Sequence, residues 1–232
     1  MANISLVVGA NKLDRIITDA ELYLTEYRND TGYLYQNYQM ITSPDRVVPE
    51  DLAVTLLMNS QVGWRAFQTL YEHGHTIDLS HLTSKPLEQT SKEERKQVAS
   101  IIAQMAQLPG FGSSVATKVL HKKRPYLIPV LDNQAIYGAY MYKLWPQKPA
   151  RTDSIKDQTT ICAALDWITY DLNRPENTVA WENLQALEPK HSRIQVFDSV
   201  WWMYFRKIQP VVQSKTVVGF EKSHERENRY DK

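Results

Sequence analysis

Two short segments hold the residues whose types and spacing could do chemistry. The first, Leu108 to Ala116 (LPGFGSSVA), combines a proline and two glycines with small residues. The second, Ile128 to Asp132 (IPVLD), ends in a carboxylate 22 positions after Gly110. Glycines in a tight turn let backbone amides face outward, where a phosphate group can bind. The two segments therefore predict an anchor for a nucleic-acid backbone next to a positioned aspartate.

Asp132 has two compatible interpretations. Cleavage of an N-glycosidic bond builds positive charge on the sugar, and a nearby carboxylate stabilises that charge and can deprotonate a water molecule. Alternatively, Asp132 is a helix N-cap, because a helix is expected from Gln134 to Leu144. The neighbouring hairpin is what favours the catalytic interpretation.

Residues 108–139 resemble the core of the helix-hairpin-helix DNA glycosylases, a superfamily that includes endonuclease III and the adenine glycosylases. The chain has the L-P-G-x-G-x-x-x-A hairpin and, at the family's separation, a P-x-x-D segment. The resemblance implies that Asp132 is the aspartate essential for base excision. Bifunctional members carry a Schiff-base lysine two residues after the second hairpin glycine, where this chain has Ser114. The implied activity is a monofunctional glycosylase without a strong lyase step. The hairpin is also similar to that of uncharacterised bacterial proteins.

DNA is the expected partner, and its backbone is expected to contact the hairpin and the basic residues after it. Residues 1–90 hold 6 Lys/Arg and 11 Asp/Glu, whereas residues 91–125 hold 7 and 2. A local basic excess is typical of a surface that meets a polyanion, although a solvated, lysine-rich helix pair would look the same. A plain corner between two helices is the alternative for the hairpin itself. The expected backbone-binding residues are Leu108, Gly110, Gly112, Ser114, Lys118, Lys122, Lys123 and Arg124.

A glycosylase must take its base out of the stack, which requires a wedge and a pocket lined by aromatic or amide side chains. Residues 56–62 (LLMNSQV) are similar to the family's I-L-S-Q-Q-T region, with an amide retained at Gln61. The other candidates are Trp64 and three tyrosines, Tyr33, Tyr35 and Tyr38. Core packing or simple surface exposure is the alternative for each of them.

Composition and periodicity predict an all-α protein, a two-lobed helical bundle with the active-site cleft between its lobes. Apolar residues make up 43% of the chain and charged residues 23%, as in ordinary globular proteins. Helical spacing dominates and strand alternation is scarce. We expect one domain over residues 1–212 and a charged, frayed tail over 213–232. The expected helices include 14–27, one opened by a Ser91–Glu94 capping box, and the aromatic stretch 197–205.

The aromatic stretch contains Asp198, which has two interpretations. A charge near the N-terminus of that helix is favoured over a second carboxylate in the pocket. The lone Cys162 excludes disulfides within the chain and four-cysteine metal sites, and is expected to be a buried thiol. His73, His75 and His81 lack acidic or cysteine partners at ligand spacing, so neither a metal nor a cofactor is expected.

The sequence also favours some locations and activities over others. No apolar run approaches the roughly 20 residues of a membrane span, and the N-terminus is a poor signal peptide, so we expect a cytoplasmic protein. The oligomeric state stays open, with a monomer favoured. Two alternatives compete with the glycosylase: a non-catalytic helix-hairpin-helix DNA-binding protein, and a structural or regulatory helical protein whose hairpin is only a corner.

Overall fold

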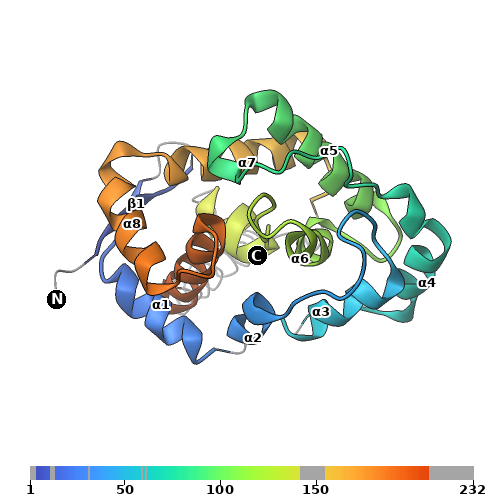
Figure 1. Ribbon diagram of the computed structural model, residues 1–232, viewed down its shortest axis with the longest axis horizontal. Coiled ribbons are helices and arrows are strands. Elements are labelled where there is room, and N and C mark those ends of the chain that lie inside the picture. Colours follow the sequence, from blue (N-terminus) through green and yellow to red (C-terminus); the bar gives the residue numbers. More distant parts are fainter. Residues whose placement is uncertain are drawn as a thin grey trace, which may run out of the picture.

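The protein is an all-α molecule in the computed structural model, which confirms the predicted class (Figure 1). The structure describes residues 4–10, 14–30, 32–58, 60, 62–141 and 155–208. The predicted tail, 213–232, lies outside these residues. The elements are β1 (Leu6–Val8), β2 (Arg15–Ile17), α1 (Ala20–Arg28), α2 (Gly32–Asn37), η1 (Pro49–Leu52), α3 (Ala53–Leu56), α4 (Trp64–His73), η2 (Gly74–Thr76), η3 (Leu87–Gln89), α5 (Lys92–Gln107), α6 (Ser113–Lys123), η4 (Asn133–Tyr140), α7 (Gln158–Leu172), η5 (Pro175–Asn177), α8 (Thr178–Leu187) and a helix over residues 193–208.

The N-terminal segment differs from the prediction, because the expected helix over 14–27 begins only at Ala20. Strands β1 and β2 pair antiparallel, with Leu6 opposite Ile17. The β-branched run at 16–18 favours extended backbone, which outweighs the helical spacing of the apolar residues. Asp19, in the left-handed region at φ 61°, makes the turn into α1.

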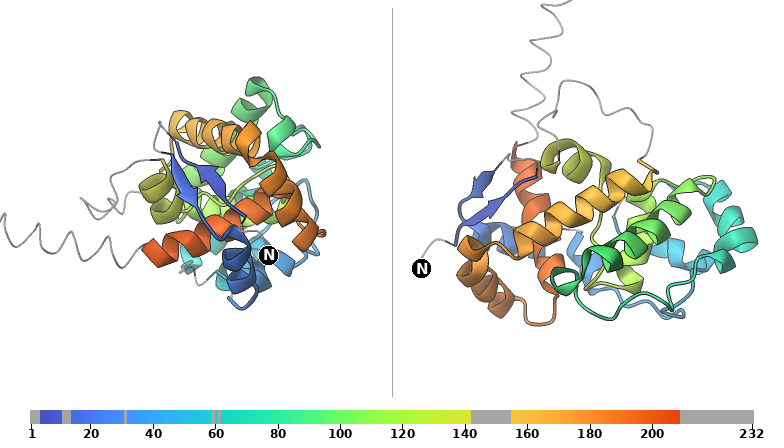
Figure 2. Two further views of the ribbon diagram at one scale, coloured as in Figure 1. Left: turned by 90° about the vertical axis from the view of Figure 1, so that its left-hand side faces the viewer. Right: turned by 90° about the horizontal axis from the view of Figure 1, so that it is seen from above.

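Helices α5 and α6 form the predicted hairpin. The Ser91 hydroxyl accepts from the Glu94 amide at 3.2 Å, and the Glu94 carboxylate accepts from the Ser91 amide at 2.7 Å, so the capping box is confirmed. Helix α5 ends at Gln107, and Gly110 turns the chain with φ +86°, in the left-handed region. The buried face of α5 packs against α6 and α7, and α5 and α7 run side by side across the molecule (Figure 2).

The helix after Asp132 is a π-helix, η4, rather than the α-helix expected from Gln134. The Tyr137 amide donates to the Asp132 carbonyl at 3.2 Å, and the Met141 amide donates to the Ile136 carbonyl at 2.9 Å. Such i→i−5 turns are rare and are frequently found at functional sites. The end of the predicted helix, 142–144, lies outside the described residues.

The aromatic C-terminal stretch is helical, as predicted, within the helix over residues 193–208. Its Phe197 and Trp201 are buried and pack edge-on against Tyr140 of η4, with ring centroids 5.7 and 5.3 Å apart. The indole of Trp201 also donates to the Ala135 carbonyl at 2.8 Å. These contacts fix η4, and with it Asp132, against the C-terminal helix.

Candidate active site

A cavity of about 420 Å³ lies beside Asp132. Side chains from α1, α2, the segment that follows α3, α6, the start of η4 and the C-terminal helix line it, so segments from both halves of the chain build one site. Its aromatic walls come from the start and the end of the chain, and its charged groups from Asp30, α6, the N-cap of η4 and the 193–208 helix. The lining side chains that the argument below uses are Tyr27, Tyr35, Ser60, Lys118, Asp132, Asp198, Trp201, Trp202 and Arg206.

Asp132 caps η4 and faces the cavity at the same time. Its Oδ1 accepts from the amides of Gln134 and Ala135 at 2.8 and 3.0 Å, so the N-cap prediction is confirmed. Its Oδ2 lies 3.4 Å from the Ser114 hydroxyl, the only hydrogen bond found for this oxygen among the described residues. The hairpin position Ser114 and the Asp132 carboxylate, 18 residues apart in the chain, are therefore neighbours.

Lys118 lies in the cavity wall, not on an exposed surface that could meet a phosphate backbone. The residue is 7% exposed, and its Nζ donates to the Ser60 hydroxyl at 2.6 Å. Burial lowers the pKa of Lys118, while the negative charge of Asp132 acts in the opposite direction. This position argues against the predicted contact of Lys118 with a DNA backbone, because the helix turns the side chain inward.

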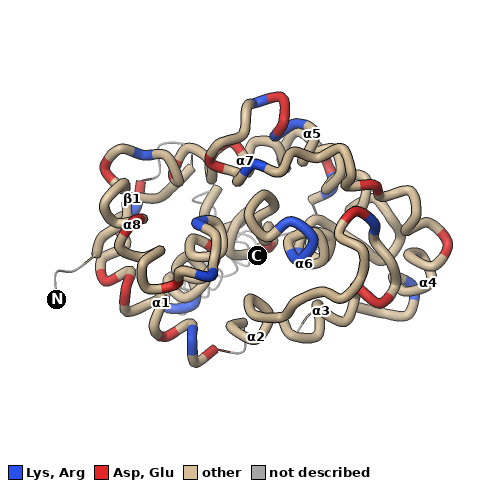
Figure 3. The backbone as a smooth tube through the Cα atoms, viewed as in Figure 1, with Lys and Arg blue, Asp and Glu red and all other residues tan. Residues whose placement is uncertain are grey.

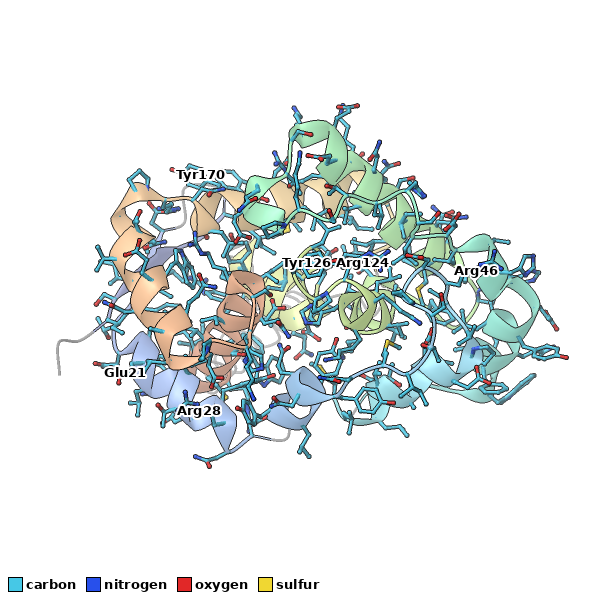
Figure 4. The ribbon with its side chains drawn as sticks, viewed as in Figure 1. Glu21, Arg28, Arg46, Arg124, Tyr126 and Tyr170 are labelled. Atoms are coloured by element: carbon cyan, nitrogen blue, oxygen red, sulfur yellow. The ribbon has the colours of Figure 1, made fainter. Side chains whose placement is uncertain are left out.

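Lys123 and Arg124, at the C-terminal end of α6, also make internal contacts. The fully buried Nζ of Lys123 lies 2.8 Å from the buried carboxylate of Asp51. Arg124 is 8% exposed and donates to Asp45 at 2.6 Å and to the Pro44 carbonyl at 2.8 Å. In Figures 3 and 4 this end of α6, including the labelled Arg124, lies near the centre of the view. These internal contacts argue against the prediction that Lys123 and Arg124 contact DNA.

Lys122 is half-buried and ties α6 to α2. Its Nζ donates to the carbonyls of Tyr35 and Gln36 at 2.9 Å each and lies 5.2 Å from the centre of the Tyr35 ring. Burial lowers its pKa to about 8. Its ammonium is already satisfied by carbonyl oxygens, so Lys122 is a link within the fold rather than a free phosphate ligand.

Only part of the hairpin is exposed to solvent. A Cβ on the exposed Gly110 would lie 2.9 Å from the Ala66 amide, so the turn packs closely on the first turn of α4. Gly112 is buried, Leu108 packs against the core, and the Ser113 amide donates to the Ile155 carbonyl at 3.1 Å. The exposed part is the Pro109–Gly110 tip, next to half-buried Ser114.

The structure places only one of the predicted base-pocket residues in the cavity wall. Tyr35 lines the cavity, stacked on His121 at 5.8 Å, with its hydroxyl donating to the Lys118 carbonyl at 2.6 Å. Trp64 does not line it; this residue is 75% exposed, at the start of α4. Tyr33 and Tyr38 are not among the lining residues, and Gln61 lies outside the described residues.

The C-terminal helix supplies cavity residues that the sequence did not single out for the pocket. Trp201 and Trp202 form part of the wall, and Arg206 forms an ion pair with Asp30 at the rim. The aromatic composition of 197–205 was the available signal, but it also fits a core helix.

Asp198 is a pocket carboxylate, which corrects the favoured interpretation. The side chain is 8% exposed and lies in the second turn of its helix, beyond the N-terminal positions. Burial raises its pKa well above the usual range, although the Val130 amide donates to Oδ2 at 3.2 Å. The site thus pairs Asp132 with a second, desolvated carboxyl group.

The described residues contain no group of three or more His, Cys, Asp or Glu side chains placed to hold a metal ion. Within the same residues, no helix has the length and apolar character needed to cross a bilayer. The sole cysteine, Cys162, is half-buried rather than fully buried as predicted.

Comparison with known proteins assigns the chain to a family without assigning it an activity. No curated protein and no solved structure matches it. A family model described as "Family of unknown function (DUF6308)" matches residues 16–205. The match runs from β2 into the C-terminal helix, and so includes the hairpin and Asp132. Since it spans most of the chain, the protein belongs to this family of unknown function.

Proposed function

We propose that the protein is a DNA glycosylase that hydrolyses the N-glycosidic bond of a damaged or modified base. The observation that carries the proposal is the position of Asp132, which lines a 420 Å³ cavity and lies 3.4 Å from Ser114 of the hairpin. The resemblance of residues 108–139 to helix-hairpin-helix glycosylases supports the same reaction. A hairpin against the DNA backbone would bring the reacting sugar to this carboxylate.

The cavity offers what an extruded base requires. Its volume lies within the roughly 300–1,000 Å³ of small-molecule sites, and the aromatic residues Tyr27, Trp201 and Trp202 lie in its wall. As the bond to the base breaks, positive charge develops on the deoxyribose, and Asp132 stabilises that charge. Asp132 then orients or deprotonates the attacking water, so hydrolysis needs no cofactor.

The DNA-facing surface in this proposal is the hairpin tip together with Trp64. Gly110 packs on Ala66 in the first turn of α4, the helix turn that begins with the exposed Trp64. An exposed aromatic side chain there can act as the wedge that fills the gap left by a flipped base. Because the cations of α6 are internal and the Ser113 amide already donates to the Ile155 carbonyl, the exposed Pro109–Gly110 tip rather than the lysines would provide the main backbone contacts.

The test is incubation of the protein with duplexes that each carry one of a broad set of damaged or modified bases. Alkali treatment then reveals abasic sites, and product analysis identifies the released base. Release of any base supports the proposal. Salt-sensitive binding without release would favour the non-catalytic DNA-binding alternative. If the protein neither binds these duplexes nor releases a base, the hairpin is only a structural corner between two helices.

A further inference from the structure

Helix α4 lies at the end of the molecule far from β1 and α8, and one of its faces is an exposed aromatic stripe (Figure 1). The stripe consists of Trp64, Phe67 and Tyr71, which are 75%, 52% and 78% exposed. Spacings of three and four residues place these side chains on one face of the helix. The other face, with Ala66 and Leu70, is buried in the core. Contiguous exposed apolar surface of this kind marks an interaction site.

A groove of about 290 Å³ lies beside the N-terminal part of the stripe. Trp64 and Phe67 line it together with Leu52 of η1 and Leu56 of α3. Leu56 is itself exposed, so the apolar surface continues from the stripe across the groove. Tyr71, two turns after Trp64, is not among the lining residues. The face therefore has a hollow at one end and an exposed aromatic ring at the other.

Two opposite charges flank the stripe. Arg65 and Glu72 are exposed and seven residues apart, so they lie on the same flank of α4, two turns from each other. The Gln68 amide donates to the Glu72 carboxylate at 2.8 Å, which holds that carboxylate along the helix. About 10 Å of helix rise separates the two charges, so neither neutralises the other within the chain.

We propose that this face binds a second copy of the chain, with the two α4 helices antiparallel about a twofold axis near Phe67. Tyr71 of each copy then enters the groove of the other copy, because the ring and the groove lie about equally far from the axis on opposite sides. In the same arrangement Arg65 of each copy lies beside Glu72 of the other. A twofold contact requires a surface that is complementary to itself, and this face carries both members of each pairing.

The area of the face suits a weak but specific dimer. An aromatic side chain offers about 200 Å² of contact surface, so the exposed fractions of the stripe together with Leu56 amount to roughly 500 Å² in each copy. Two copies would bury about 1,000 Å², the lower limit for a specific interface between proteins. The proposal departs from the monomer that the sequence favours.

The dimer does not rest on the proposed function, but it bears on it. Trp64 is the wedge residue in that proposal, and the second copy covers it. If both proposals hold, DNA and the second copy compete for α4, and only the monomer acts on DNA.

Sedimentation velocity of the full-length protein between about 1 and 200 µM tests the association, in the range expected of an interface of this size. We expect a shift from monomer to dimer as concentration rises. Arg65→Glu and Glu72→Arg each place like charges in both contacts, so each should weaken the dimer at least about tenfold. An equimolar mixture of the two variants should regain the wild-type affinity, because every contact in the mixed dimer again joins opposite charges.

The aromatic part of the contact has its own variant. Tyr71→Ala should weaken the dimer at least about tenfold, whereas Val179→Ala, at an exposed apolar position on α8, should leave it unchanged.

A protein that stays monomeric at the highest concentration would overturn the proposal, whether residues 209–232 or a different partner then covers the stripe. A dimer that withstands both charge reversals, or that the mixture does not restore, would also overturn it. Recovery in the mixture cannot come from misfolding of either variant. Because sedimentation requires no base release, this proposal and the glycosylase fail separately.

Discussion

Asp132 uses its two carboxylate oxygens differently. One oxygen holds the first amides of η4 and the other lies 3.4 Å from Ser114. The structural and the catalytic interpretations therefore do not compete for the same atoms. A cap that costs roughly 1 kcal/mol to lose also fixes the direction of the second oxygen, which a catalytic carboxylate requires.

Gly110 should be the position in the hairpin least tolerant of a side chain. Its φ of +86° disfavours any other residue, and a Cβ would lie 2.9 Å from the backbone nitrogen of Ala66. We expect Gly110→Ala to lower the free energy of unfolding by about 1–3 kcal/mol in urea denaturation. Gly63→Ser is the control, because its Cβ meets open space and serine suits that N-cap position. Equal stabilities of the two variants would contradict the close packing of the hairpin on α4.

At the scale of elements, helix α6 serves two purposes along its length. Its first turns place Ser114 against Asp132 and Lys118 in the cavity wall, and its last turn buries Lys123 and Arg124 against the 42–51 segment. The Lys123 ammonium, for instance, reaches the Thr42 hydroxyl at 2.6 Å and the Ser43 carbonyl at 2.8 Å. The basic end of α6 thus holds the N-terminal third of the chain in place.

Lys123→Met should therefore affect stability and not the salt dependence of DNA binding. Removing the ammonium leaves the buried Asp51 carboxylate uncompensated, and we expect a loss of about 3–5 kcal/mol in denaturant unfolding. The half-exposed pair of Lys96 with Glu93 is the comparison, and Lys96→Met should cost less than about 1 kcal/mol. A fall of about one in the salt slope of DNA affinity on Lys123→Met would instead mean that Lys123 contacts a phosphate.

At the scale of the whole molecule, the sequence predicted local structure well and the site only in part. The capping box, the hairpin, the Asp132 cap and the aromatic helix follow from short-range chemistry, so they could be identified from the residues. The cavity could not, because Tyr27 and Trp201 meet only after the ends of the chain have packed together. Lys123 is paired with Asp51, which lies 72 positions earlier in the chain. The residues next to a lysine in the sequence do not show whether it is exposed or has such a distant partner.

His121 links distant parts of the molecule and should make stability depend on pH. Its ring nitrogens lie 2.6 Å from the Ile128 carbonyl and 3.3 Å from the Gln36 side chain, and burial lowers its pKa to about 3. Between pH 3 and about 6.5 the unfolded chain binds a proton that the folded chain does not. The contribution of His121 to stability should therefore fall as pH drops through 6.5, by up to about 1.4 kcal/mol per pH unit. The buried carboxyl groups of Asp198 and Asp171, whose pKa burial raises, contribute with the opposite sign, so the His121 contribution is read from the difference between the wild-type protein and a His121 variant.

Urea denaturation between pH 7.5 and 5.5 measures this effect. His121→Gln should flatten the profile in that range, whereas His73→Gln, at an exposed position, should leave it unchanged. The partly buried His191, whose pKa burial also lowers, contributes a remaining slope of the same sign. Equal slopes for the wild-type protein and His121→Gln over this range would contradict a buried, neutral His121.

The most direct test of the central claim compares the wild-type protein with Asp132→Asn on a duplex from which the wild-type protein releases a base. Asparagine caps helices as well as aspartate does, so the variant should fold and bind the duplex with unchanged affinity. Because it lacks the carboxylate charge, its single-turnover rate of base release should fall by at least about a hundredfold. Release at the wild-type rate would show that Asp132 only caps η4 and would contradict the assigned chemistry.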